Sequence, residues 1–81
     1  MNLYVGNISL KTSEYLLRKV FERYGKVDKI SMNEKSIDEK DYRFCFVSMP
    51  FENQASYAIK MLNGKKINGN VLSIMESALS V

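Results

Sequence analysis

Tyr42-Arg43-Phe44-Cys45-Phe46-Val47-Ser48-Met49 is the stretch that decides the fold of this chain. Its aromatic residues and Val47 are typical of a β-strand. Side chains alternate between the two faces of a strand, so Phe44 and Phe46 emerge together on one face while Cys45 and Val47 emerge on the other. Both faces are apolar, and periodicity alone therefore does not say which of them is buried.

The segment before this strand predicts a second strand and a helix. Residues 2–8 alternate, with Leu3 and Val5 on one face and Tyr4 on the other, and residues 7–11 are predicted to form a loop. Ser13 is a good helix N-cap. An amphipathic helix follows, ended by a glycine; its apolar positions and its stop are Leu17, Val20, Phe21, Tyr24 and Gly25.

The remaining pattern completes a strand–helix rhythm. Residues 26–33 and 71–76 are predicted strands, 52–63 a helix ended by Gly64, and 67–70 a turn, while the polar, net acidic segment 34–41 connects two strands. The order is β-α-β-β-α-β, which predicts an α+β, ferredoxin-like fold: a four-stranded antiparallel sheet with both helices on one face. Large apolar rings on the other, uncovered face would mark a binding site.

Composition limits the class of protein. The 81 residues predict one domain over residues 1–78 with a short tail at 79–81, and the net charge of +3 is compatible with a polyanionic partner. No apolar run approaches the roughly 20 residues that cross a membrane, so no membrane partner is expected. A single cysteine indicates a reducing compartment, and we expect a cytoplasmic location.

At this point the chain resembles the RNA recognition motif family. Phe44 and the Phe46-Val47 pair match the family octapeptide K/R-G-F/Y-G/A-F-V-x-F/Y, and the segment 3–8 looks like the companion hexapeptide, with Tyr4 in its stacking position. The resemblance implies that Cys45 faces the helices and that the three rings face outward, where they stack on bases of single-stranded RNA.

The octapeptide departs from the family pattern at four positions. Tyr42 stands where Lys or Arg is usual, Arg43 where Gly is usual, Cys45 where Gly or Ala is usual, and Met49 where the last aromatic is usual. Arg43 restores the missing charge one residue along, or it reaches the sheet edge or the helix side. The short chain without Gly-rich or Arg-rich tails resembles the single-domain members of bacteria, including cyanobacteria.

The predicted RNA-binding residues are the three rings, their neighbours on the same face, and Arg43, which alternation places next to this face rather than on it. In full they are Tyr4, Phe44, Phe46, Asn2, Tyr42, Arg43, Lys29, Ser31, Ser48, Ser73 and Met75. Stacking alone does not distinguish RNA from single-stranded DNA. The alternative for each residue is ordinary strand core or solvated strand surface.

Other functions are also weighed against the sequence. The apolar face would equally suit a protein–protein interaction or homodimerisation module of the same fold, and Tyr15, Leu16 and Met61 add apolar surface elsewhere. Lys60, Lys65 and Lys66 indicate a solvated helix end and turn more than a binding site. Catalysis is not expected, because the chain has no histidine and no CxxC pair; no cofactor, metal or small-molecule substrate is expected either.

Overall fold

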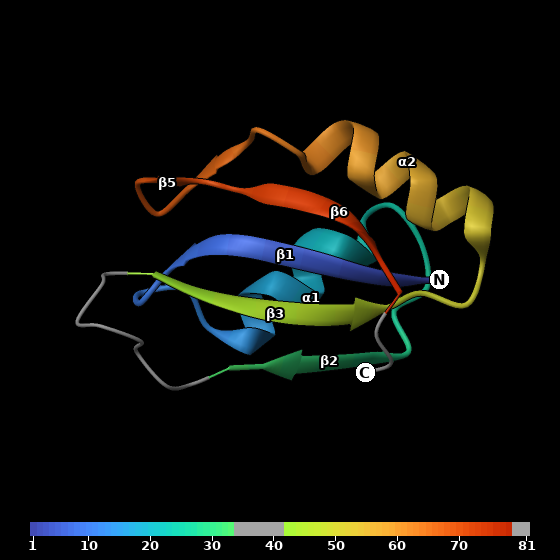
Figure 1. Ribbon diagram of the computed structural model, residues 1–81, viewed down its shortest axis with the longest axis horizontal. Helices are drawn as coiled ribbons and strands as arrows, with labels where there is room; N and C mark the ends of the chain where they lie inside the picture. Colours follow the sequence, from blue (N-terminus) through green and yellow to red (C-terminus); the bar gives the residue numbers. More distant parts are fainter. Residues whose placement is uncertain (34–41, 79–81) are drawn as a thin grey trace.

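A four-stranded antiparallel sheet in the spatial order β2-β3-β1-β6 organises the molecule (Figure 1). The computed structural model describes residues 1–33 and 42–78. The strands of this sheet are β1 (Asn2–Ser9), β2 (Lys29–Met32), β3 (Tyr42–Ser48) and β6 (Ser73–Ser77). Together with two helices they confirm the predicted ferredoxin-like α+β fold.

The helices α1 (Glu14–Glu22) and α2 (Glu52–Leu62) cover one face of the sheet, and Figure 1 shows α1 directly behind it. As predicted, Ser13 is the N-cap of α1: its Oγ accepts a hydrogen bond of 3.0 Å from the Leu16 N–H. Neither helix is long and apolar enough to cross a membrane, and no other helix occurs in residues 1–33 and 42–78.

The core lies between the helices and the inner face of the sheet. Alternating residues in the middle of β1 and β3 are fully buried, and the helices contribute small and large apolar residues to the same cluster. Its members at 0% exposure include Leu3, Val5, Cys45 and Val47 from the sheet and Leu17, Phe21, Ala55, Ala58 and Leu62 from the helices. The small side chains of Ala55 and Ala58 let α2 pack closely on the sheet.

Gly25 has a different role from the predicted one. A glycine that ends a helix usually takes a positive φ, but Gly25 is absent from the positive-φ residues, and the C-cap of α1 is Arg23. A Cβ at Gly25 would lie 2.4 Å from the Cβ of Gln54. Gly25 is therefore required for space, where the turn after α1 meets α2 and the Lys26 N–H donates to Gln54 Oε1.

Three of the predicted strands have other boundaries in the structure, the first two being β1 and β2. β1 extends to Ser9, past a bulge between Val5 and Ile8 where Asn7 has a φ of 60°, whereas residues 7–11 were expected to be a loop. The strand expected at 26–33 is shorter, at Lys29–Met32.

The strand expected at 71–76 is divided in two. Its first residue belongs to a small hairpin of β4 (Lys66–Ile67) and β5 (Asn70–Val71), Leu72 lies between the two strands, and the residues from Ser73 onward belong to β6. The two hairpin loop residues, Asn68 and Gly69, have φ values of 49° and 89°, as a tight turn between two strands requires. The connection 34–41 and the tail 79–81 lie outside the described residues.

Candidate nucleic-acid interface

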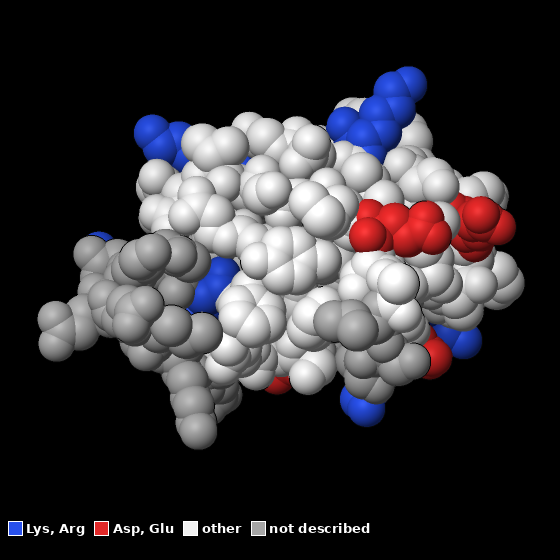
Figure 2. All heavy atoms as spheres, in the orientation of Figure 1, with Lys and Arg blue, Asp and Glu red and all other residues white. Residues whose placement is uncertain are grey.

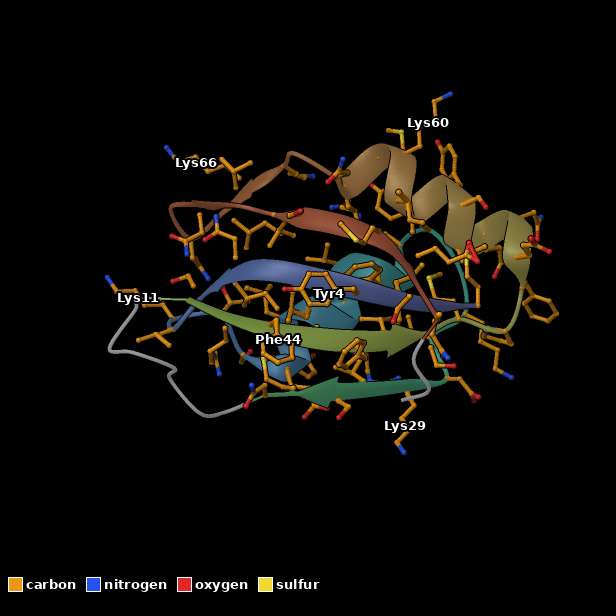
Figure 3. All side chains as sticks on the ribbon, viewed as in Figure 1. Tyr4, Lys11, Lys29, Phe44, Lys60 and Lys66 are labelled. Atoms are coloured by element: carbon orange, nitrogen blue, oxygen red, sulfur yellow. The ribbon has the colours of Figure 1, made fainter. Side chains whose placement is uncertain are left out.

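Three aromatic rings lie together on the sheet face that has no helices. Tyr4 of β1 pairs directly with Phe46 of β3, and Phe44 lies two residues before Phe46 in β3 and on the same face. The ring centroids are 5.8 Å apart for Tyr4 and Phe44, 5.9 Å for Tyr4 and Phe46, and 6.0 Å for Phe44 and Phe46. We call these three side chains the aromatic platform (Figure 3).

The strand register extends the aromatic platform into rows that cross the whole sheet. Directly paired residues of antiparallel strands project on the same side, so each row presents four side chains to solvent. From β2 to β6 the two rows are Ser31-Phe46-Tyr4-Met75 and Lys29-Ser48-Asn2-Ser77. The predicted positions Asn2, Lys29, Ser31, Ser48 and Met75 therefore lie on the face of the rings, and Ser73 lies there too, opposite Gly6.

Gly6 lets the Tyr4 ring lie flat against the strand. A Cβ at Gly6 would be 2.9 Å from Tyr4 Cε1 and 3.0 Å from Tyr4 Oη, so the ring covers the space that a side chain would fill. Tyr4 thereby leans toward Phe44, and the two ring planes are inclined by 30°. This role of Gly6 was not predicted from the sequence, although glycine inside a strand often marks close approach or a bulge.

Charge is sparse at the centre of this face. Figure 2 shows uncharged side chains across the middle, acidic ones to the right, and most of the basic ones at the rim. Lys29 is exposed, at the end of β2 away from Lys11 (Figure 3). The face therefore offers stacking surface more than phosphate-directed charge.

Arg43 does not share this face and instead reaches away from the rings, which is one of the two positions that the sequence left open. Its side chain projects on the side of the strand opposite to that of Phe44, and its Nη2 donates to the backbone oxygens of Ser9, Leu10 and Thr12. Arg43 thus fastens the loop between β1 and α1. The side chain of Tyr42 lies outside the described part of the structure.

The other side of β3 is core, as the family resemblance implied. Cys45 and Val47 are fully buried, and burial raises the pKa of the Cys45 thiol from 9.0 to about 12. A thiol with so high a pKa is a poor nucleophile, since the thiolate is the reactive form. Within the described residues, His, Cys, Asp and Glu form no group of three that could hold a metal ion.

The lysines and apolar residues that were weighed as secondary surfaces lie away from the aromatic platform. Lys60, Lys65 and Lys66 are exposed on α2 and around β4 (Figure 3 labels Lys60 and Lys66). Tyr15, Leu16 and Met61 are exposed on the helices, with Tyr15 reaching 70%. The Lys19 ammonium lies 5.5 Å from the centroid of the Tyr15 ring.

Comparison with known sequences matches this architecture to one family. The model of the RNA recognition motif matches residues 3–73. Human RNA-binding protein 7 is 38% identical over 72 residues, covering 89% of this chain and 27% of that protein. Nuclear cap-binding protein subunit 2 of Xenopus tropicalis is 33% identical over 70 residues, covering 86% of this chain and 46% of that protein.

These relatives change one expectation from the sequence. They are eukaryotic proteins, so the bacterial or cyanobacterial affiliation is not borne out. The chain also spans less than half the length of either relative.

Solved structures show the same fold. A crystal structure titled RNA Binding Protein PG1 superposes with a TM-score of 0.83 at 30% identity, covering 100% of this chain and 98% of that one. The Rna15 RRM with bound RNA (GU) gives a TM-score of 0.80 at 18% identity, covering 99% and 85% of the two chains. At that identity the second likeness concerns the fold alone.

Proposed function

The chain belongs to the RNA recognition motif family, and we propose that it binds single-stranded RNA by stacking bases on the aromatic platform. The observation that carries the proposal is the grouping of Tyr4, Phe44 and Phe46, all within 6.0 Å of one another on the sheet face without helices. Unpaired bases splayed over aromatic rings are the usual way in which proteins reach RNA sequence. The relatives whose names refer to RNA or cap binding support the same function.

The rows of the sheet suggest how the neighbours contribute. Ser31 and Met75 flank the Phe46–Tyr4 pair, so a base stacked on either ring has a hydroxyl or a thioether at its edge. Asn2, Ser48, Lys29 and Ser73 offer further polar groups around the rings. We propose that these residues supply the hydrogen bonds that distinguish one base from another, while the rings supply most of the affinity.

The expected affinity follows from the number of stacks. Each base-on-ring stack contributes about 1–3 kcal/mol, and the cost of association must be subtracted from the sum. Two or three stacks then correspond to dissociation constants that are roughly micromolar. Because charge is sparse on the face, we expect a shallow dependence on salt, with a slope of about 0.7 per neutralised phosphate.

The test is titration of short single-stranded oligonucleotides with the wild type and with Tyr4→Ala, Phe44→Ala and Phe46→Ala. Each substitution is expected to weaken binding by a factor of roughly 5–150, corresponding to 1–3 kcal/mol. The matched controls are Tyr15→Ala in α1 and Phe51→Ala at the N-cap of α2, which remove rings exposed by 70% and 51%. Unchanged affinity in all three platform variants, or equal losses in the controls, contradicts the proposal.

The same titrations with RNA and DNA of one sequence decide the preferred nucleic acid. We propose RNA, whose 2′-hydroxyl can bond to the polar side chains that border the rings. Equal affinity for both strands would reduce the proposal to single-stranded nucleic acid in general.

A second candidate for the same face is another protein chain, including a second copy of this one. The uncharged middle of the face favours it, because apolar surface of this kind also suits a protein partner (Figure 2). Light scattering over a range of concentrations, with and without RNA, separates the two. A dimer that dissociates when RNA is added would indicate that RNA and the second copy of the chain bind to the same aromatic platform. A protein that stays monomeric at all concentrations would rule out the homodimer.

The cytoplasmic location and the organisation of the protein as one RNA recognition motif domain over residues 1–78 stay predictions. The buried, unpaired Cys45 is compatible with a reducing compartment.

A further inference from the structure

A polar pocket lies at the end of the sheet, beyond the aromatic platform. It has a volume of about 380 Å³ and opens between the loop that follows β1 and the β4–β5 hairpin. Its lining residues are Ser9, Leu10, Lys11, Asn68 and Asn70. We call it the end pocket; four of its five lining residues carry polar side chains.

Hydrogen bonds hold the two walls of the end pocket together. Asn68 Nδ2 donates to Thr12 Oγ1 over 2.9 Å, linking the hairpin turn to the loop after β1. Asn7 Nδ2 donates to the Val71 oxygen over 2.8 Å and fixes the base of the hairpin against β1. The end pocket is thus formed before any ligand arrives, which lowers the ordering cost of binding.

Two basic side chains of the described residues lie at the end pocket. Lys11 is exposed at its rim, and the Arg43 guanidinium bonds to the backbone oxygens of the same loop. The one ion pair in the described part of the chain joins Lys19 and Glu22, so neither Lys11 nor Arg43 is neutralised there.

We propose that the end pocket binds a backbone phosphate of the same nucleic-acid strand that stacks on the aromatic platform. Lys11 meets the phosphate charge, and the Asn70 amide and the Ser9 hydroxyl donate hydrogen bonds to its oxygens, as such side chains commonly do. This inference rests on the proposed function.

The distance between the two sites sets a length requirement. Tyr4 and Ser9 are five positions apart along β1, which corresponds to roughly 16 Å at about 3.3 Å per residue. A strand that stacks on Tyr4 must therefore continue for more than one nucleotide before its phosphate reaches Lys11. Figure 3 shows Lys11 at the end of the sheet opposite Lys29, so the strand extends toward the hairpin end of the molecule.

The experiment measures affinity for single-stranded oligonucleotides of increasing length with the wild type, Lys11→Gln and the matched control Lys60→Gln, which removes an exposed lysine of α2. We expect the wild type and Lys60→Gln to bind more tightly once the strand reaches the end pocket. Lys11→Gln should bind short strands normally but lack this gain, and its salt slope for long strands should fall by about 0.7.

A chemical change in the ligand tests the same contact from the other side. Neutral methylphosphonate linkages are placed one at a time along the long strand. One position should weaken the wild type and leave Lys11→Gln unaffected; equal losses in both proteins overturn the inference. Inorganic phosphate added to the complex with the long strand should not displace that strand. Displacement by phosphate at concentrations similar to those of the strand would show a site for free anions instead.

Failure of the two proposals is distinguishable. If no strand of any length binds the wild type, the proposed function fails and the inference fails with it. If short strands bind and Tyr4→Ala weakens them, but Lys11→Gln and Lys60→Gln agree at every length, only the end pocket is rejected.

Discussion

The two sides of β3 carry side chains of similar apolar character in opposite surroundings. Cys45 and Val47 are fully buried beneath the helices, whereas Phe44 and Phe46 remain partly exposed on the open face. The size of the apolar side chains therefore does not decide which side of β3 is buried, because the helices cover the smaller residues and leave the larger rings exposed to solvent. Apolar surface on the covered side stabilises the fold, and on the open side it is available for a partner.

The largest expected effect separates these two uses on neighbouring residues of β1. Leu3→Ala removes a fully buried side chain and should lower the free energy of unfolding by about 2–5 kcal/mol. Tyr4→Ala removes a larger side chain from the open face and should cost clearly less stability, while it weakens RNA binding. Urea denaturation measures both; equal losses of stability would contradict the division between the faces.

A second prediction concerns one methyl group added at Gly25, where the turn after α1 meets α2. Gly25→Ala would place its Cβ 2.4 Å from Gln54 Cβ and Oε1, so we expect a loss of about 1–3 kcal/mol of stability from overpacking. Gln54→Ala in the same protein shortens the side chain and should recover part of the loss. Thermal unfolding of the single and double variants measures this, and purely additive losses would show that the contact does not matter.

The same methyl group on the open face should act on binding. Gly6→Ala meets the Tyr4 ring at 2.9 Å, but that ring borders solvent and can turn aside. We expect little change in stability and a loss of about 1–2 kcal/mol in RNA affinity, because the displaced ring stacks less well. Oligonucleotide titration alongside urea denaturation separates the two readouts. A large loss of stability with unchanged RNA affinity per folded molecule would contradict this prediction.

The smallest expected effect is a dependence on pH from Cys45. Burial raises the pKa of its thiol from 9.0 to about 12, so the folded state prefers the protonated form. Its contribution to stability is complete below pH 9 and is lost as pH rises from 9 toward 12. By pH 9.5 the loss should be on the order of 1 kcal/mol. Cys45→Ala should show a flatter decline over this range in otherwise identical denaturation curves; parallel curves would contradict the assignment.

Much of the fold could be predicted because each helix and strand of the main sheet carries its own periodic pattern. The alternation of residues 2–8 and the helical spacing of Leu17 and Phe21 are local signals, and the structure confirms them. The boundaries were harder to predict. Val71 reads as part of one strand with Ile74, but its pairing with Lys66 in the hairpin depends on contacts between segments.

The site was partly predictable for the same reason. Phe44 and Phe46 had to share a face, but only the family resemblance indicated that this face lies open. The direction of Arg43 followed from strand alternation, while its partners at Ser9 and Leu10 depend on how the loop after β1 folds back. The space that Gly25 leaves for Gln54 is likewise a property of two segments meeting.

The most direct measurement is the set of intermolecular nuclear Overhauser effects in the protein bound to a short single-stranded RNA. If bases stack on the aromatic platform, ring protons of Tyr4, Phe44 and Phe46 will show contacts to nucleobase protons at saturation. Contacts confined to the exposed rings of Tyr15, Tyr57 or Phe51 on the helix side, with none to these three, would contradict the account.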